Sequence, residues 1–535
     1  MSASSKKKLR NEQQTAKMTE KQVAEQKEAK KLTLYTTIFV VVLAVMVVFA
    51  IAIGVTRSIS NSGVRERNTV ALTVGDHEIS NAELSYFYMS AINNFNSNYG
   101  NYAAMMGLDT SKPLDEQVIN NDTGLTWADD FLNTAKDNAR SVYAMADAAE
   151  AAGFTLSEDE LAEIDTSISN MKMYATLYGY SSTKDFLKAQ YGSGATEESY
   201  KQYVTVNALA NAYYNSYSSS LTYTDADLRA AESENYDKYS SFTYNTYYLA
   251  ASKFQAEDED DSDKAVKAAE EAANSLIGED VATVADFDAA IAALDINKDT
   301  EASSTAYTDQ QYASVSTTVR DWITDSARKE GDKTVIANTT TSTDDDGNET
   351  KTTLGYYAVF FTGSNDNTFP LVNVRHILVK FEGGTTDSTT GTTTYSDEEK
   401  NAAKEKAEEI LDEWMSGDAT EDSFAALANE KSGDGDGTTG GLYENVYPGQ
   451  MVSSFNDWCF DASRQSGNTG IIESEYGYHV MYFVGKSSTT YRDYQIESEL
   501  RSTDTQEWYD ATVEAVPMTD GNTKYIRKNL IISAS

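Results

Sequence analysis

The first strong pattern along the chain is an uninterrupted apolar run near its beginning. Residues 32–55 contain no charged side chain. As a helix rising about 1.5 Å per residue, this run would exceed the roughly 30 Å hydrocarbon core of a bilayer. The preceding residues, 1–31, form a basic tail with nine Lys or Arg and four Glu. The pattern predicts a single transmembrane helix, with the tail in the cytoplasm and all later residues outside the cell membrane.

A cleaved signal peptide is the alternative interpretation of the same run. Ala50-Ile51-Ala52 resembles the small-residue motif of a cleavage site. The run is, however, longer than the apolar region of a signal peptide, which usually has about 7 to 15 residues. No cysteine stands directly after the run, which excludes a lipid anchor at that point. We therefore favour an uncleaved anchor.

Helical periodicity dominates the next part of the chain. Apolar residues recur at three- and four-residue spacing over 161–177 and 200–217. Residues 73–84 indicate a strand, a tight turn and a helix start, which Asn81 or Ser80 would cap. We expect residues 68–235 to form a helical, chaperone-like lobe. Its frequent tyrosines are suited to binding other polypeptides, although ordinary packing explains any single tyrosine equally well.

From Ser241 onward the pattern becomes strand, helix, helix and strand, and this succession occurs twice. Residues 319–331 and 455–467 share Asp, Trp, Asp, Arg and Gly at the same spacing. Each block leads into a similar apolar strand, at 355–363 and 477–485. Two such coincidences in one order predict two tandem copies of one domain.

These boundaries complete an α+β architecture. We place the two copies at 241–366 and 371–488, and we expect a helix over 491–515. The Thr-rich and Gly-rich stretches 339–353 and 383–394 are expected to be loops inserted between elements.

Composition narrows the possible chemistry. The 535-residue chain has 43 Lys and Arg against 84 Asp and Glu, a net charge of −41, which argues against binding a phosphate backbone and excludes nucleic acid as the main ligand. Its single cysteine, Cys459, permits no internal disulfide and no Cys/His metal cluster. We expect no metal or cofactor, and we expect Cys459 to be a small buried hydrophobe.

The two copies differ at positions where chemistry is possible. Two of the three histidines, His376 and His479, lie on strands at opposite ends of the second copy, where antiparallel pairing would bring them together. The first copy is expected to have Tyr247 and Tyr357 at these places. One strand histidine is usually a packing or surface residue, but the loss of both in a duplicate indicates a site that one copy kept.

The second copy resembles the parvulin family of peptidyl-prolyl isomerases, and the resemblance covers the whole domain. The segments that carry it are the opening strand 374–379, the second helix 423–428, the loop 432–434, the pocket segment 440–442 with 449–451 and Phe455, and the closing strand 476–479. One departure is visible at 440–444, where Gly-Gly-Leu-Tyr-Glu replaces the common Gly-Gly-Asp-Leu-Gly. The order of anchor, helical region, parvulin domain and terminal helix is similar to extracytoplasmic foldases of the PrsA and SurA type, and the anchor is similar to that of PpiD.

The resemblance implies a peptidyl-prolyl cis-trans isomerase. Rotation about an X-Pro bond crosses a barrier of about 18 to 20 kcal/mol. Catalysis of this rotation needs an apolar slot and polar groups that favour the twisted amide, rather than a nucleophile or a metal. His376, Asp434 and His479 are the implied catalytic cluster. The implied substrate-binding residues are Leu442, Met451, Phe455 and Ser474. Met451 and Phe455, four residues apart, are expected on one helix face.

The implied partners are unfolded or newly exported polypeptides that contain proline, together with membrane lipid around the single helix. In relatives of this architecture the terminal helix packs on the helical lobe. The alternative function is a noncatalytic holdase or surface adhesin that uses the isomerase domains as spacers.

Overall fold

The computed structural model describes residues 62–532, apart from 256–261, 344–347, 389, 436 and 438. The predicted tail 1–31 and the predicted membrane span 32–55 lie outside the described residues. Within the described ranges, no helix has the length and apolar character needed to cross a membrane. The chain divides into two compact units, Met1–Leu221 with Asp504–Ser535, and Thr222–Thr503.

The first unit is mainly helical and also contains a three-stranded antiparallel sheet of order β15-β1-β2. The sheet strands are β1 (Val70–Val74), β2 (His77–Ser80) and β15 (Met518–Asp520), and a short hairpin joins β3 (Val118–Asn120) to β4 (Leu125–Thr126). The helices are α2 (Val64–Asn68), α3 (Asn81–Tyr99), α4 (Trp127–Ala151), α5 (Glu158–Leu177), α6 (Thr183–Tyr191), α7 (Glu197–Ser220) and the end of α15 (Tyr491–Ala515).

Both ends of the described chain build this unit. Ser80 caps α3 by accepting the Glu83 N–H, as its position predicted. Helix α15 occupies the predicted range 491–515, and its Trp508 stacks on Tyr217 of α7 with ring centroids 3.7 Å apart. The C-terminal strand β15 then pairs with β1. Segments from the two ends of the sequence therefore share one unit.

Helix α8 (Asp225–Glu234) belongs to the second unit, although the sequence placed it in the lobe. Glu232 lies 2.5 Å from the Arg492 guanidinium, and Arg229 lies 2.8 Å from Asp493. Arg492 is fully buried and also donates to the Tyr236 and Asp366 carbonyl oxygens. A buried guanidinium needs such partners, so α8 is tied to the start of α15.

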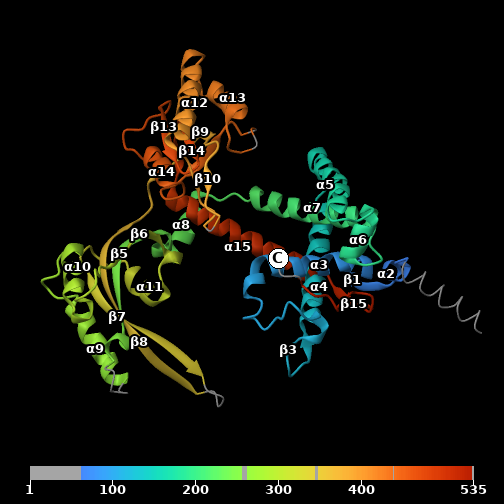
Figure 1. The fold of residues 1–535 in the computed structure, drawn as a ribbon, viewed down its shortest axis with the longest axis horizontal. Coiled ribbons are helices and arrows are strands. Elements are labelled where there is room, and N and C mark those ends of the chain that lie inside the picture. Colours follow the sequence, from blue (N-terminus) through green and yellow to red (C-terminus); the bar gives the residue numbers. More distant parts are fainter. Residues whose placement is uncertain are drawn as a thin grey trace, which may run out of the picture. The chain divides into compact units, whose positions relative to one another are not determined.

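The second unit contains two four-stranded antiparallel sheets, each with its own helices (Figure 1). The first sheet has β5 (Ser241–Ala250), β6 (Thr305–Gln311), β7 (Lys333–Thr343) and β8 (Glu349–Asn365), with helices α9 (Ser262–Ser275), α10 (Val284–Ala293) and α11 (Thr317–Ile323). The second has β9 (Pro370–Lys380), β12 (Leu442–Val446), β13 (Thr469–Ser474) and β14 (Gly477–Thr490), with helices α12 (Asp397–Ser416), α13 (Glu421–Lys431) and α14 (Ser453–Cys459).

The two sheets have the same strand order, β6-β5-β8-β7 and β12-β9-β14-β13. In each, the first and last strands lie at the centre. The Arg328 guanidinium carbon lies 4.4 Å from the Trp322 ring centroid, and that of Arg464 lies 4.1 Å from the Trp458 centroid. These are the Trp and Arg that the sequence comparison paired.

The shared glycines also have the same conformation. Gly331 and Gly467 have φ angles of 88° and 85°, a left-handed conformation that favours glycine. Their N–H groups donate to the carbonyl oxygens of Phe361 and Phe483 at 2.9 and 2.8 Å. Each glycine thus ends the same turn before the third strand.

Strand register corrects one predicted correspondence. Gly355 lies opposite Ala250, and Gly477 lies opposite Lys380. Tyr357 and His479 each lie two residues after the glycine, so they occupy equivalent positions on β8 and β14, as predicted. His376, however, pairs with Met481, and the equivalent pair in the first sheet is Thr246 with Val359, not Tyr247 with Ala358. A slip of one residue exchanges the two sheet faces, so Tyr247 packs among the helices instead.

Both stretches expected to be loops contain strands. Strands β7 and β8 continue past the sheet as a long hairpin that includes Thr339–Thr343 and Glu349–Thr353 (Figure 1). The stretch 383–394 holds a small hairpin of β10 (Thr385–Thr386) and β11 (Thr393–Thr394). Threonine is β-branched and favours strands, which the polar character of these stretches obscured.

Candidate active site

The two predicted imidazoles meet on one face of the second sheet. His376 lies on β9 and His479 on β14, its antiparallel neighbour. Their Nδ1 atoms are 3.0 Å apart. His376 is 3% exposed and His479 is 5% exposed. Both polar rings are therefore buried and hydrogen-bonded to each other, as buried polar groups require.

Asp434 and Ser474 extend this pair at its two ends. Asp434 Oδ2 lies 3.0 Å from His376 Nε2, and Ser474 Oγ lies 2.7 Å from His479 Nε2. Ser432 positions the Asp434 loop, because its hydroxyl accepts the N–H groups of Asp434 and Leu378 at 3.1 Å. The structure thus brings together four of the predicted site residues.

The donors and acceptors of this network follow from one assignment. An ionised Asp434 accepts only, so His376 donates from Nε2 and accepts at Nδ1. His479 then donates from Nδ1 and accepts from the Ser474 hydroxyl at Nε2. All hydrogen bonds therefore point from Ser474 toward Asp434.

Local electrostatics agree with this assignment. Burial lowers the pKa of His376, opposed by Asp434. Burial lowers the pKa of His479 to about 4, with a further lowering from His376. Burial by itself would raise the pKa of Asp434, but hydrogen bonds from Tyr443 and His376 outweigh it and leave this pKa lowered. Near neutral pH, both imidazoles are thus neutral and the carboxylate is charged.

A mostly apolar cavity of about 330 Å³ opens beside the network. Phe455, 3% exposed, makes T-shaped ring contacts with His376 and His479, with centroids 5.3 and 5.7 Å away. The cavity is lined by His376, Leu378, Lys380, Asp434, Tyr443, Met451, Val452, Phe455, Tyr476 and His479. It joins an apolar wall to a polar end.

Two details of the predicted slot differ. Met451 lines the cavity but precedes α14, which begins at Ser453, so it shares no helix face with Phe455. Leu442 is not among the lining residues, whereas its neighbour Tyr443 is. Successive strand side chains point to opposite faces, and both residues lie on β12, which explains the exchange.

Sequence reasoning missed Tyr443, Lys380 and Tyr476. The Tyr443 hydroxyl donates to Asp434 Oδ2 at 2.8 Å. Its strand position beside Leu442 was the available signal. Lys380 ends β9, and Tyr476 lies next to Gly477 at the start of β14. Cys459, by contrast, is buried as expected, and burial raises the pKa of its thiol to about 12.

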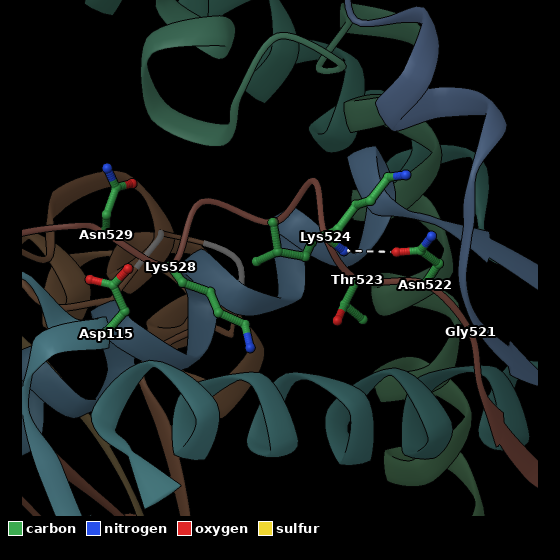
Figure 2. Close-up of a pocket in the computed structure, with 8 residues that line it drawn as sticks. Asp115, Gly521, Asn522, Thr523, Lys524, Lys528 and Asn529 are labelled. Carbon is green, nitrogen blue, oxygen red and sulfur yellow. Dashed lines mark hydrogen bonds between the residues drawn. The ribbon is translucent and has the colours of Figure 1, made fainter. Parts of the chain in front are cut away.

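Another cavity, of about 720 Å³, lies in the first unit (Figure 2). It is lined by Asp115 and the C-terminal segment from Gly521 to Asn529, and Lys528 on its wall is paired with Asp129 at 2.6 Å. It contains no histidine. Within the described ranges, no three His, Cys, Asp or Glu side chains are placed to hold a metal ion.

The fold and site agree with one known domain class. Residues 360–487 match the family model described as a PPIC-type PPIASE domain. The chain therefore contains a parvulin-type peptidyl-prolyl cis-trans isomerase domain. No curated protein matches the chain.

Solved structures of PrsA, two of them described as peptidylprolyl isomerases, are similar to parts of the chain. PrsA from Bacillus anthracis is 21% identical over 28% of this chain and 59% of its own, with a TM-score of 0.17. PrsA from Bacillus cereus is 26% identical over 28% of this chain and 50% of its own, with a TM-score of 0.18. PrsA from Bacillus subtilis is 15% identical over 75% of this chain and 90% of its own, with a TM-score of 0.25. The chain thus spans 59% of the first of these structures and 50% of the second.

Proposed function

We propose that residues 371–488 catalyse the cis-trans isomerisation of X-Pro bonds in unfolded or newly exported polypeptides. The proline ring occupies the cavity against Met451, Val452 and Phe455. The polar end of the cavity favours the twisted amide over the planar one, which is where a catalyst of this reaction gains rate. The mechanism is noncovalent.

One observation carries this proposal: the directed network Ser474, His479, His376, Asp434 forms one end of an apolar cavity. A structural role alone does not require two buried histidines to face an open cavity. His376, Asp434 and His479 are the proposed catalytic residues, and Ser474 completes their hydrogen bonds.

A refolding assay tests the function on a polypeptide substrate. The slow, proline-limited refolding phase of an unrelated protein should accelerate when the full chain is added in substoichiometric amounts. The double variant His376→Ala/His479→Ala should lose this acceleration, whereas Tyr357→Phe in the first sheet should keep it. Unchanged refolding with the wild-type chain would refute the function.

We infer that residues 241–366 are a duplicate without catalysis. The shared strand order and the paired Trp–Arg contacts support duplication. Thr246 and Tyr357 occupy the places of the two imidazoles, so the first copy has no equivalent network. Isomerase activity in a fragment of residues 241–366 alone would contradict this inference.

The first unit is proposed to bind client polypeptides. A groove of about 260 Å³ between α4, α7 and the end of α15 is lined in part by Val142, Met145, Tyr214 and Tyr509. Its mixture of apolar surface and phenol groups suits adaptable binding. This groove also favours the second candidate function, a holdase that needs no isomerisation.

Aggregation of an unfolded client tests the groove. Tyr214→Ala should weaken suppression of aggregation, whereas Tyr174→Ala, which removes a half-exposed tyrosine of α5, should not. Equal suppression by both variants would place client binding elsewhere.

The proposed location is extracytoplasmic, with the apolar run 32–55 as an anchor in the cell membrane. Protease added outside intact cells should digest the chain beyond Val55 and spare the basic tail. Protection of the large region would reverse this orientation.

A further inference from the structure

Tyr443 has two kinds of contact in the cavity. Its hydroxyl donates to Asp434 Oδ2 at 2.8 Å, the same oxygen that lies 3.0 Å from His376 Nε2. Its ring centroid lies 5.0 Å from that of His376 and 6.3 Å from that of Phe455. One side chain therefore forms part of the wall and also supplies a proton donor.

The second donor matters because Asp434 is the exposed end of the network. The Asp434 side chain is 37% exposed, whereas that of His376 is 4% exposed. A carboxylate on a solvent-accessible loop rotates freely unless a second group holds it. Tyr443, on the sheet edge strand β12, and Ser432, through the loop backbone, hold it from two sides.

We propose that Tyr443 is a positioning residue for the isomerisation, holding Asp434 so that Oδ2 remains the acceptor for His376 Nε2–H. This inference rests on the proposed isomerase function. The phenol thereby fixes the tautomers of both imidazoles and leaves the Ser474 hydroxyl directed at His479. An aliphatic side chain at position 443 would supply the wall without this control.

The charged and titratable groups around Asp434 define how pH should act. His376 and Lys380 come from β9, Tyr443 from β12 and His479 from β14, and Tyr476 precedes that strand. Hydrogen bonds from Tyr443 and His376 keep the pKa of Asp434 below its usual value. Removing the phenol hydroxyl weakens the preference for the anion, so Asp434 would take up a proton at a higher pH.

Tyr443→Phe in the full chain tests the inference, since it keeps the ring and removes only the hydroxyl. We expect kcat to fall about tenfold, the scale of a hydrogen bond to a charged acceptor, with KM nearly unchanged. The acid limb of the kcat profile should move to higher pH. In an Asp434→Asn background the same change should have no further effect.

Tyr478→Phe is the matched control. The Tyr478 hydroxyl donates to Glu473 at 2.9 Å, and its side chain packs in the helix-covered core rather than lining the cavity. This variant should retain the wild-type kcat and pH profile. If Tyr443→Phe behaves like this control while the wild-type chain is active, the inference is overturned.

A measurement without turnover separates this inference from the isomerase function. With only three histidines in the chain, selective ¹⁵N-histidine labelling allows NMR assignment of each tautomer. Tyr443→Phe should change the signals of His376 and His479 and leave His77 unaffected. Unchanged imidazole signals would overturn the positioning role, whereas an inactive wild-type chain with changed signals would refute the isomerase function alone.

Discussion

At the scale of single residues, substitutions in the polar network and substitutions in the apolar wall should affect different measured quantities. His479→Ala and Asp434→Ala remove network partners and should lower kcat about ten- to hundredfold, the range expected for one hydrogen bond to a charged or buried partner. Circular dichroism should show an intact fold, because the hydrophobic cores remain. Wild-type turnover in both variants would mean that this network is not the catalytic one.

The wall residues should act through binding and stability. Phe455 is buried among both histidines and Tyr443, so Phe455→Ala should cost about 3 to 5 kcal/mol of unfolding free energy and raise KM. Met451 is only partly buried, so Met451→Ala should raise KM with a smaller loss of stability. Denaturant titration and steady-state kinetics measure the two effects. A fall in kcat without a change in KM would contradict this assignment.

The buried imidazoles should make this domain sensitive to acid. His479 has a folded-state pKa of about 4, below its usual 6.5. Its neutral form is favoured in the fold, so the unfolded chain binds more protons between these values and stability falls as pH drops from 6.5 toward 4. The loss should approach about 3 kcal/mol below pH 4.

Denaturant midpoints measured between pH 7 and 4 check this dependence. His479→Gln keeps a polar side chain without this titration and should show a flatter profile over the same range. Equal slopes for both proteins would contradict a depressed pKa at His479.

At the scale of elements, a glycine turn positions His376. Gly441 has a φ of 63°, its carbonyl accepts the His376 N–H at 2.9 Å, and an added Cβ would lie 2.2 Å from the His376 carbonyl oxygen. Gly441→Ala should therefore displace β9 and lower both activity and stability. Gly467→Ala is the matched control: its φ is 85°, but a Cβ there meets nothing within 4 Å.

The control isolates the cost of left-handed backbone, about 1 to 2 kcal/mol. In denaturant titration, Gly441→Ala should lose more unfolding free energy than Gly467→Ala. It should also reduce turnover. Equal effects of the two substitutions would show that the close approach to His376 has no consequence.

Local patterns predicted elements better than they predicted register. Helical spacing and capping residues placed α3, α5, α7 and α15, because these signals lie within a few residues of each other. The equivalence of Thr246 with His376 depends on which residues pair across the sheet, and a one-residue slip leaves the local pattern plausible. The same limit affected Leu442 and Tyr443, since only strand pairing decides which side chain faces the cavity.

At the scale of the molecule, the change from a mainly helical region to two sheets with their own helices was readable, because the periodicity changes near Ser241. The assignment of α8 was not, because it depends on Glu232 and Arg492, which are 260 residues apart in sequence. The meeting of His376, Asp434, His479 and Ser474 was predictable only through the family resemblance. Antiparallel pairing supplied a reason for the two histidines alone.

Equilibrium exchange spectroscopy on a short proline peptide tests the central claim most directly, since it needs no coupled protease. The wild-type chain, at substoichiometric concentration, should raise the cis-trans exchange rate above the uncatalysed timescale of about 10 to 100 s. His376→Ala/His479→Ala should return exchange to the uncatalysed rate while circular dichroism remains unchanged. Full exchange activity in this folded double variant would contradict the claim that the histidine network over the cavity lowers the barrier.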